Sequence, residues 1–133
     1  MSAEVTYLDT SAAVKLLMTE AESPALREWL GERPVRVSAA LLRVELIRAV
    51  RRAGLPRLVP EARRLLAGVY LVRLDNELLD RAAELDPTEL RSLDSIHLAA
   101  AAGFGDDLAA IVSYDDRLLA AAASLGLPTA TPS

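Results

Sequence analysis

Short runs of β-branched and apolar residues alternate along the chain with longer segments whose apolar positions recur at helical spacing. The runs at 5–8, 35–37, 69–72 and 110–112 predict strands, with a weaker fifth at 128–130. The intervening segments, bounded by Pro and Gly, predict helices near 11–18, 24–32, 39–53, 58–67, 76–86, 92–103 and 116–124. Strands that alternate with helices favour parallel crossovers. The pattern therefore predicts an α/β sandwich with a central parallel sheet.

Length and composition narrow the class of protein. With 133 residues, 52% of them hydrophobic, the chain predicts a single domain over 1–133. The sequence has no cysteine and one histidine, His97, which excludes thiolate zinc sites and multi-histidine metal sites. No apolar run approaches the roughly 18 residues of a membrane span. We therefore expect a cytoplasmic protein with no membrane partner.

Charge is unevenly distributed along the chain. The net charge of −4 taken alone argues against a nucleic-acid partner, because phosphates repel an acidic surface. Residues 41–64, however, hold seven arginines against two glutamates, which leaves −9 for the rest of the chain. This basic stretch needs an explanation.

Three acidic residues lie just after predicted strands. Asp9 comes after the first strand, and Asp115 and Asp116 come after the fourth. Ligands of open parallel sheets bind outside the carboxyl ends of the strands, so these positions are candidates for a site. Each also suits a helix N-cap, where an Asp accepts a backbone N–H bond that contributes about 1 kcal/mol. For either Asp9 or Asp115 alone, capping is the favoured interpretation.

Two further acids fall near the starts of predicted helices. Glu45 lies among apolar positions, on the helix face that would otherwise belong to the core, where a carboxylate is costly unless it is paired or binds a metal. An intrahelical ion pair with Arg48 or Arg52 is the alternative. Asp94 opens its helix, where it complements the helix dipole and where Ser92 or Asp94 itself could be the cap.

We expect the four acids to meet at one edge of the sheet, because each sits near the start of a helix in a βα fold. Four like charges held a few ångströms apart repel strongly, so such a cluster implies a neutralising cation. Oxygen ligands without His or Cys favour Mg²⁺ or Mn²⁺ over zinc. The set is Asp9, Glu45, Asp94 and Asp115.

Four segments around these acids resemble the acidic motifs of PIN domains, and above all those of the ribonuclease toxins of VapBC toxin–antitoxin modules. They read YLDTSA from Tyr7, RVEL from Arg43, LDSIHLA from Leu93 and SYDDRL from Ser113. The resemblance covers nearly the whole chain, and LDSIH is its most specific piece. It implies a PIN-like three-layer sandwich, a Mg²⁺- or Mn²⁺-dependent endoribonuclease acting on RNA, a homodimer, and a cognate VapB-like antitoxin that blocks the site.

The resemblance assigns catalysis and metal coordination to the same four acids. Because Mg²⁺ keeps several of its waters, we expect Asp9 and Asp94 to be the more direct ligands, with Glu45 and Asp115 acting partly through water. Asp115 is taken as the ligand in place of Asp116 because it immediately follows the Ser-Tyr strand end.

Neighbouring polar residues have supporting functions in this interpretation. The hydroxyls of Thr10, Ser11 and Ser113 are expected beside the acids, with helix capping as an equally good explanation. His97 follows Asp94 by three residues, so it could hydrogen-bond near the site, although packing among its neighbours is the favoured expectation.

The basic stretch acquires a function in the same interpretation. Arg48 and Arg52 lie three and seven residues after Glu45, on its side of the helix, where they could bind RNA phosphates; a solvated charged face is equally compatible. Lys15 is a weaker candidate for the same function.

Two other functions remain open from the sequence. A phosphotransfer receiver or a phosphatase also places Asp residues at strand ends, but the phosphatase pattern requires Asp-x-Asp, and here Thr10 and Ser11 follow Asp9. A non-catalytic PIN-like module that only holds RNA or a partner would need none of the four acids. The presence of all four therefore favours the enzyme.

Overall fold

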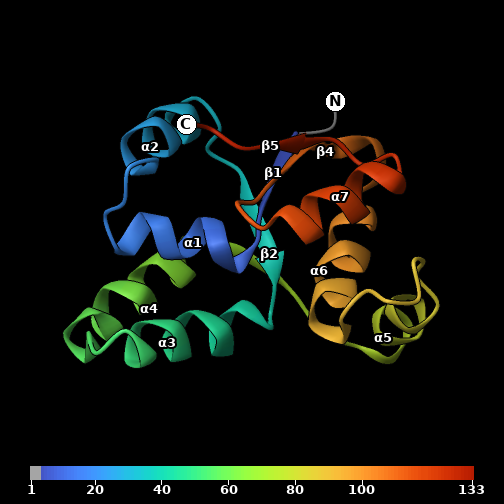
Figure 1. The fold of residues 1–133 in the computed structure, drawn as a ribbon, viewed down its shortest axis with the longest axis horizontal. Coiled ribbons are helices and arrows are strands. Elements are labelled where there is room, and N and C mark those ends of the chain that lie inside the picture. The colour runs from blue at the N-terminus through green and yellow to red at the C-terminus, as the bar shows by residue number, and fades with distance from the viewer. Residues whose placement is uncertain (1–3) are drawn as a thin grey trace.

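The computed structural model, which describes residues 4–133, has a five-stranded parallel sheet between two layers of helices (Figure 1). The strands are β1 (Val5–Leu8), β2 (Arg36–Ala39), β3 (Tyr70–Val72), β4 (Leu108–Val112) and β5 (Thr129–Ala130). Their order in the sheet is β3-β2-β1-β4-β5. The α/β fold and the parallel sheet predicted from the sequence are confirmed.

The helices fall where the periodicity predicts them, with shifts of a few residues at their ends. They are α1 (Thr10–Leu17), α2 (Ser23–Gly31), α3 (Leu42–Arg52), α4 (Val59–Ala67), α5 (Asn76–Ala83), α6 (Ser92–Ala102) and α7 (Asp116–Ser124). Two short 3₁₀ turns, η1 (Pro56–Leu58) and η2 (Gly105–Asp107), were not predicted. The third helix begins at Leu42 and not near 39, because β2 continues to Ala39, which pairs with Val72.

Local chemistry explains several helix ends. Asp75 caps α5 by accepting the Leu78 backbone N–H at 2.9 Å. Gly54 and Gly126 follow the ends of α3 and α7, both with φ of +74°, a conformation that side chains with a Cβ rarely adopt. Gly126 leads the chain back to β5, whereas Gly54 leads it into η1 and α4.

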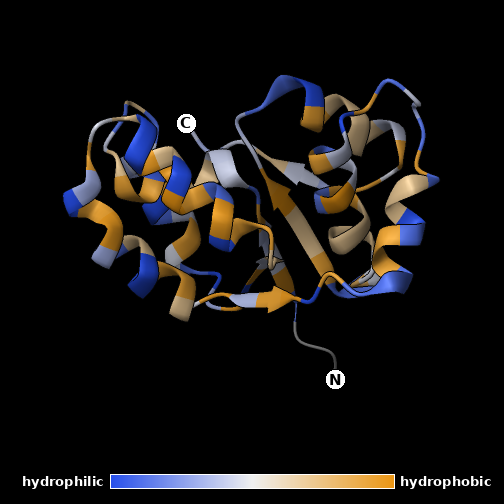
Figure 2. Ribbon diagram, turned by 90° about the horizontal axis from the view of Figure 1, so that it is seen from below, coloured by the Kyte–Doolittle hydropathy of each residue, from blue (hydrophilic) through white to orange (hydrophobic). Residues whose placement is uncertain are grey.

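Alternation along the central strands divides the core into two faces. Tyr7 and Ile111 pack with residues of α5, α6 and α7 on one face. Leu8 and Val112 point to the other face and pack with α1 and α2. A further buried cluster joins α1, α3 and α4 on that second side. Figure 2 shows the apolar strands enclosed between the two helical layers.

The described residues contain no helix long and apolar enough to cross a membrane. The sheet order places a topological switch between β1 and β4, because the chain leaves these neighbouring strands toward opposite sides of the sheet. In open α/β sheets such a point is the usual place for a ligand site.

Candidate active site

The first site residues stand at the carboxyl ends of β1 and β4. Leu8 pairs with Val112 in the sheet register, so Asp9 and Ser113 come next to each other at the switch point. The backbone N–H of Asp9 donates to the Val112 carbonyl at 3.2 Å, which fixes the start of the loop.

Asp9 is buried, with 3% of its surface exposed, and both oxygens of its carboxylate accept hydrogen bonds. One oxygen, Oδ1, accepts the Ala12 N–H at 2.9 Å and the Ser11 hydroxyl at 2.7 Å. The other, Oδ2, accepts a short hydrogen bond from the Ser113 hydroxyl. Burial raises the pKa of Asp9, and these donors oppose that rise. The predicted cap is confirmed, and so is the expected position of both serine hydroxyls beside the acid.

The two serines also join the β4–α7 loop to α1. Ser11 Oγ accepts the Tyr114 N–H at 2.9 Å, and Ser113 Oγ accepts the Asp115 N–H at 3.0 Å. Each hydroxyl therefore donates to Asp9 and accepts from the loop that carries Asp115. The position of one acid is coupled in this way to the position of another.

Glu45 lies half-buried in the first turn of α3, and its partners Thr10 and His97 belong to α1 and α6. Its Oε1 accepts the Thr10 hydroxyl at 2.7 Å and contacts His97 Nε2 at 2.7 Å. Burial raises the pKa of Glu45, but the bonds from His97 and Thr10 outweigh burial and hold it below its usual value. No Arg–Glu45 ion pair occurs among residues 4–133, so the intrahelical alternative is wrong.

His97 is buried, with 3% of its surface exposed, between Glu45 and the sheet. Its Nδ1 lies 2.6 Å from the Tyr7 hydroxyl, and the two rings meet edge to face. When Nε2 of a neutral His97 donates its hydrogen bond to Glu45, Nδ1 accepts a hydrogen bond from the Tyr7 hydroxyl. The expectation of simple packing is therefore wrong, because His97 links Glu45 to β1. The three-residue spacing from Asp94 was compatible with this contact, but it could not reveal Tyr7 as the second partner.

Asp94 projects from the first turn of α6 and is half-buried. Arg91 occupies the cap position without a side-chain bond, so the prediction that Ser92 or Asp94 caps this helix is wrong. The helix begins at Ser92, so Ser92 lies one position and Asp94 three positions beyond the cap residue. Burial raises the pKa of Asp94, and the nearby charge of Asp115 raises it further, while His97 and Arg91 oppose both.

Asp115 caps α7, as predicted. Its Oδ1 accepts the N–H groups of Arg117 at 2.9 Å and Leu118 at 3.3 Å. Asp116 is the first residue of the helix and is exposed. The structure thus separates the adjacent acids into one at the site and one in solvent.

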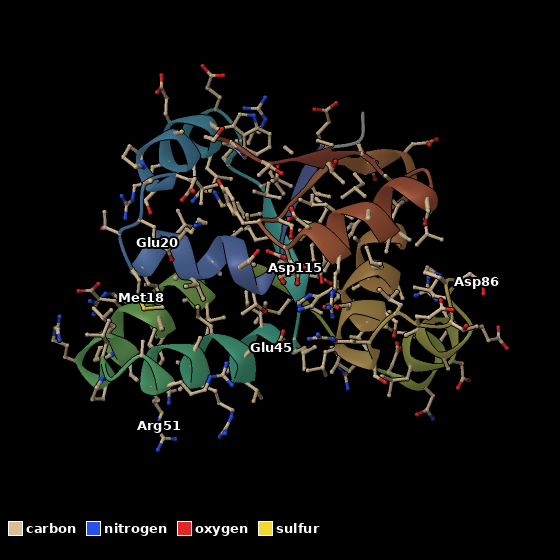
Figure 3. The ribbon with its side chains drawn as sticks, viewed as in Figure 1. Met18, Glu20, Glu45, Arg51, Asp86 and Asp115 are labelled. Carbon is tan, nitrogen blue, oxygen red and sulfur yellow. The ribbon has the colours of Figure 1, made fainter. Side chains whose placement is uncertain are left out.

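We call Asp9, Glu45, Asp94 and Asp115 the carboxylate site. Figure 3 shows Glu45 and Asp115 toward the middle of the molecule, between α1 and α3 on one side and α6 and α7 on the other. Across residues 4–133, no three His, Cys, Asp or Glu side chains stand close enough together to hold a metal ion as they are. Burial, followed by the charge of Asp115, and more weakly that of Glu45, disfavours an ionised Asp94.

The basic candidates divide into two groups. Arg48 and Arg52 are exposed on α3, the helix of Glu45, and together with Arg51 line a shallow cavity of about 240 Å³. Lys15 is instead occupied, because its Nζ pairs with Glu20 at 2.8 Å and with Glu22 at 2.9 Å. The structure therefore removes Lys15 from the phosphate-binding candidates.

Comparison with known proteins agrees with this architecture. The family model described as "PIN domain" matches residues 6–124. Ribonuclease VapC46 of Mycobacterium tuberculosis is 48% identical over 96% of this chain and 97% of its own length. Ribonuclease VapC47 of the same species is 44% identical over 95% of this chain and 96% of its own length.

Two solved structures share the fold. The crystal structure of Mycobacterium tuberculosis VapC20, described as a Sarcin-Ricin loop cleaving toxin, matches with a TM-score of 0.71 at 19% identity, over 87% of this chain and 94% of that one. A toxin-antitoxin complex from Klebsiella pneumoniae matches with a TM-score of 0.72 at 18% identity, over 96% and 98%. With the family match and the relatives above, these findings show that the chain belongs to the PIN-domain family and, within it, to the VapC ribonucleases.

Proposed function

We propose that this protein is a Mg²⁺- or Mn²⁺-dependent endoribonuclease toxin that hydrolyses RNA phosphodiester bonds in the cytoplasm and is neutralised by a cognate antitoxin. The observation that carries the proposal is the carboxylate site itself. Asp9 and Asp115 follow the neighbouring strands β1 and β4, the charges of Asp115 and Glu45 act on Asp94, and the curated relatives of this PIN-domain chain are named ribonucleases. A module that only binds RNA or a partner does not require this arrangement.

The donor set fits a hard divalent cation. All four acids offer carboxylate oxygens, which are the ligands that Mg²⁺ and Mn²⁺ prefer. We assign Asp9 and Asp94 as the more direct ligands, with Glu45 and Asp115 contributing partly through water. A bound cation would also relieve the repulsion that raises the pKa of Asp94. When bound, the metal supplies an activated water and charge stabilisation for phosphodiester hydrolysis.

The chain's own residues set the acids in place. Ser11 and Ser113 hold the two oxygens of Asp9 in fixed directions. Thr10 and His97 hold Glu45 Oε1 in the same manner. Acids oriented by neighbouring donors do not have to be ordered at the moment of reaction.

Substrate phosphates on either side of the cut need positive charge. Arg48 and Arg52 project from α3, the helix that carries Glu45, and both are exposed. We assign them to the RNA backbone, which fixes the position of the strand without reading its sequence.

For the protein partners, we propose a homodimer and an antitoxin peptide that places a basic side chain in the carboxylate site. We assign Trp29 on α2, with the apolar faces of α1 and α2, to the groove that receives this peptide. Arg33 lies over the Trp29 ring at 3.8 Å, and both residues line a cavity of about 380 Å³ near the C-terminus.

The nuclease proposal is tested with purified, partner-free protein on RNA that contains loops. We expect cleavage with Mg²⁺ or Mn²⁺, none in EDTA, and a loss of at least about a hundredfold for Asp9→Asn, more than is usual for residues that only contact a metal ligand. The matched control is Asp116→Asn, which alters an exposed acid and should cleave as wild type does. Undiminished cleavage in EDTA with an active Asp9→Asn would contradict the proposal.

The toxin assignment needs a separate experiment. Co-expression with the neighbouring reading frame, followed by pull-down, should recover a complex, and Trp29→Ala should weaken it. Absence of any association would reject the toxin assignment and leave the nuclease proposal standing.

A further inference from the structure

A cavity of about 460 Å³ opens beside Asp94, between α7 and the loop that precedes α6. This volume lies within the range of about 300–1,000 Å³ that is typical of small-ligand pockets. Leu90, Ala120 and Ala121 are apolar residues of its lining, and we call this part of the lining the floor. Asp94 also lines it, so the cavity and the carboxylate site share this residue.

Four charged side chains line the cavity: two arginines, with Glu89 and Asp94 as the two acids. Arg91 and Arg117 both line it and both are exposed. Neither forms an ion pair within 4.0 Å among the residues that the structure describes. Their guanidinium groups are therefore available to an anion, and guanidinium matches the geometry of phosphate and stacks on planar rings.

An apolar floor, two arginines without an ion-pair partner and a proposed catalytic acid match the parts of a nucleotide. The base would cover the floor, and the adjoining phosphates would meet Arg91 and Arg117. A peptide anchored by an apolar side chain would fill the floor but leave both arginines without an anion. The two unpaired arginines therefore favour RNA over a peptide.

We propose that this arginine-lined cavity binds the nucleoside next to the scissile phosphate, and that it sets the base preference at that position. The proposal rests on the proposed endoribonuclease function and extends it to a specificity-determining subsite. Unstacked bases in RNA loops are what such pockets commonly recognise.

The test fills the cavity from α7, where two exposed alanines form a matched pair. Ala120 lines the cavity and Ala123 does not. We would measure the binding of labelled RNA hairpins with loops of adenylate, cytidylate or uridylate by fluorescence anisotropy in EDTA, so that no cleavage intervenes.

Wild type should prefer one loop over the others. Ala120→Trp should raise the Kd for the preferred loop about tenfold and remove the preference, which is the size expected for loss of one base contact. Ala123→Trp should bind as wild type does. Arg117→Gln should raise the Kd for all three loops alike and reduce the salt dependence of that Kd, as loss of a phosphate contact does.

Several outcomes would overturn the inference. Equal binding of the three loops by wild type, Ala120→Trp and Ala123→Trp would show that no base enters the cavity. Unchanged RNA binding by Ala120→Trp, together with loss of the co-expressed antitoxin, would assign the cavity to the peptide. If Ala120→Trp does not fold, Ala120→Leu replaces it in the same series. Cleavage by wild type in Mn²⁺ is scored separately, so failure of the nuclease proposal is distinguishable from failure of the subsite.

Discussion

Asp9 and Asp94 occupy different parts of the carboxylate site and are held in different ways. Asp9 is buried and accepts hydrogen bonds from two donors of α1 and from Ser113, which follows β4. Asp94 is half-buried, accepts no hydrogen bond from the described residues, and carries a pKa raised by burial and by Asp115. The fold thus prepares one side of the site in advance, while the other remains electrostatically unfavourable without a cation.

This contrast separates residues that serve both the fold and the site from residues that serve the site alone. Asp9 caps α1 and ties two loops together, so its replacement disturbs structure as well as chemistry. Asp94 contributes repulsion that the folded state must tolerate. Functional residues that cost stability are a recurring sign of an active site.

The largest expected effect concerns Asp94 and the metal. Because folding raises the pKa of Asp94, the ionised group destabilises the folded state at neutral pH, and removing the group removes that cost. Metal-free Asp94→Ala should therefore be no less stable than metal-free wild type. Wild type should gain about 2.7 kcal/mol from Mn²⁺ at a hundredfold excess over its Kd, and the variant much less.

Thermal melts of both proteins, with and without Mn²⁺, give the four values needed. A metal-independent loss of stability in Asp94→Ala, with no Mn²⁺ response in wild type, would show that Asp94 is only a helix-start residue. Asp94 would then have no place in the carboxylate site.

The next prediction concerns the prepared side. Ser113→Ala leaves the buried Asp9 carboxylate without one donor and the Asp115 N–H without an acceptor. We expect a loss of about 1–3 kcal/mol in the free energy of unfolding and a fall of about 10–100-fold in cleavage. Ser92→Ala, at an exposed serine of α6, is the control. Full cleavage activity in Ser113→Ala would mean that Asp9 does not need the hydrogen bond from Ser113.

A smaller effect is expected from Tyr7→Phe. The change keeps the ring in the core and removes only the hydroxyl that contacts His97 Nδ1. His97 then has one fixed partner, Glu45, and we expect cleavage to fall about tenfold, at the low end for a contact behind a metal ligand. His97→Gln keeps a donor toward Glu45 but loses the ring, so its cleavage activity should fall further than that of Tyr7→Phe. Equal activity of Tyr7→Phe and wild type would show that the link to β1 only stabilises the core.

Much of the fold and the identity of the acids could be predicted from the sequence, because periodicity and local order carry that information. The strand ends at Asp9 and Asp115 follow directly from the apolar runs before them. The partners of Glu45 could not be predicted, since His97 lies 52 residues away and only packing of α6 on the sheet brings it close. The ion pair with Arg48 or Arg52, the alternative that the sequence left open, does not form, because Glu45 bonds to Thr10 and His97.

The smallest expected effect concerns Lys15, the only lysine in the sequence. It lies over the Tyr114 ring at 4.8 Å and pairs with two acids, so it supports the loop on the Asp9 side. Hydrogen bonds from Lys15 to Glu20 and then to Glu22 raise the pKa of Lys15 above its ordinary 10.5. A raised folded-state pKa gives stability that is fully present below the ordinary value and is lost as pH rises through the raised one.

Lys15→Met should therefore have a lower free energy of unfolding than wild type in urea at neutral pH, and this difference should narrow at alkaline pH. Arg27→Met, at an exposed residue of α2, should show no such narrowing. A gap between Lys15→Met and wild type that is independent of pH would assign the effect to packing on Tyr114 and not to the ion pairs.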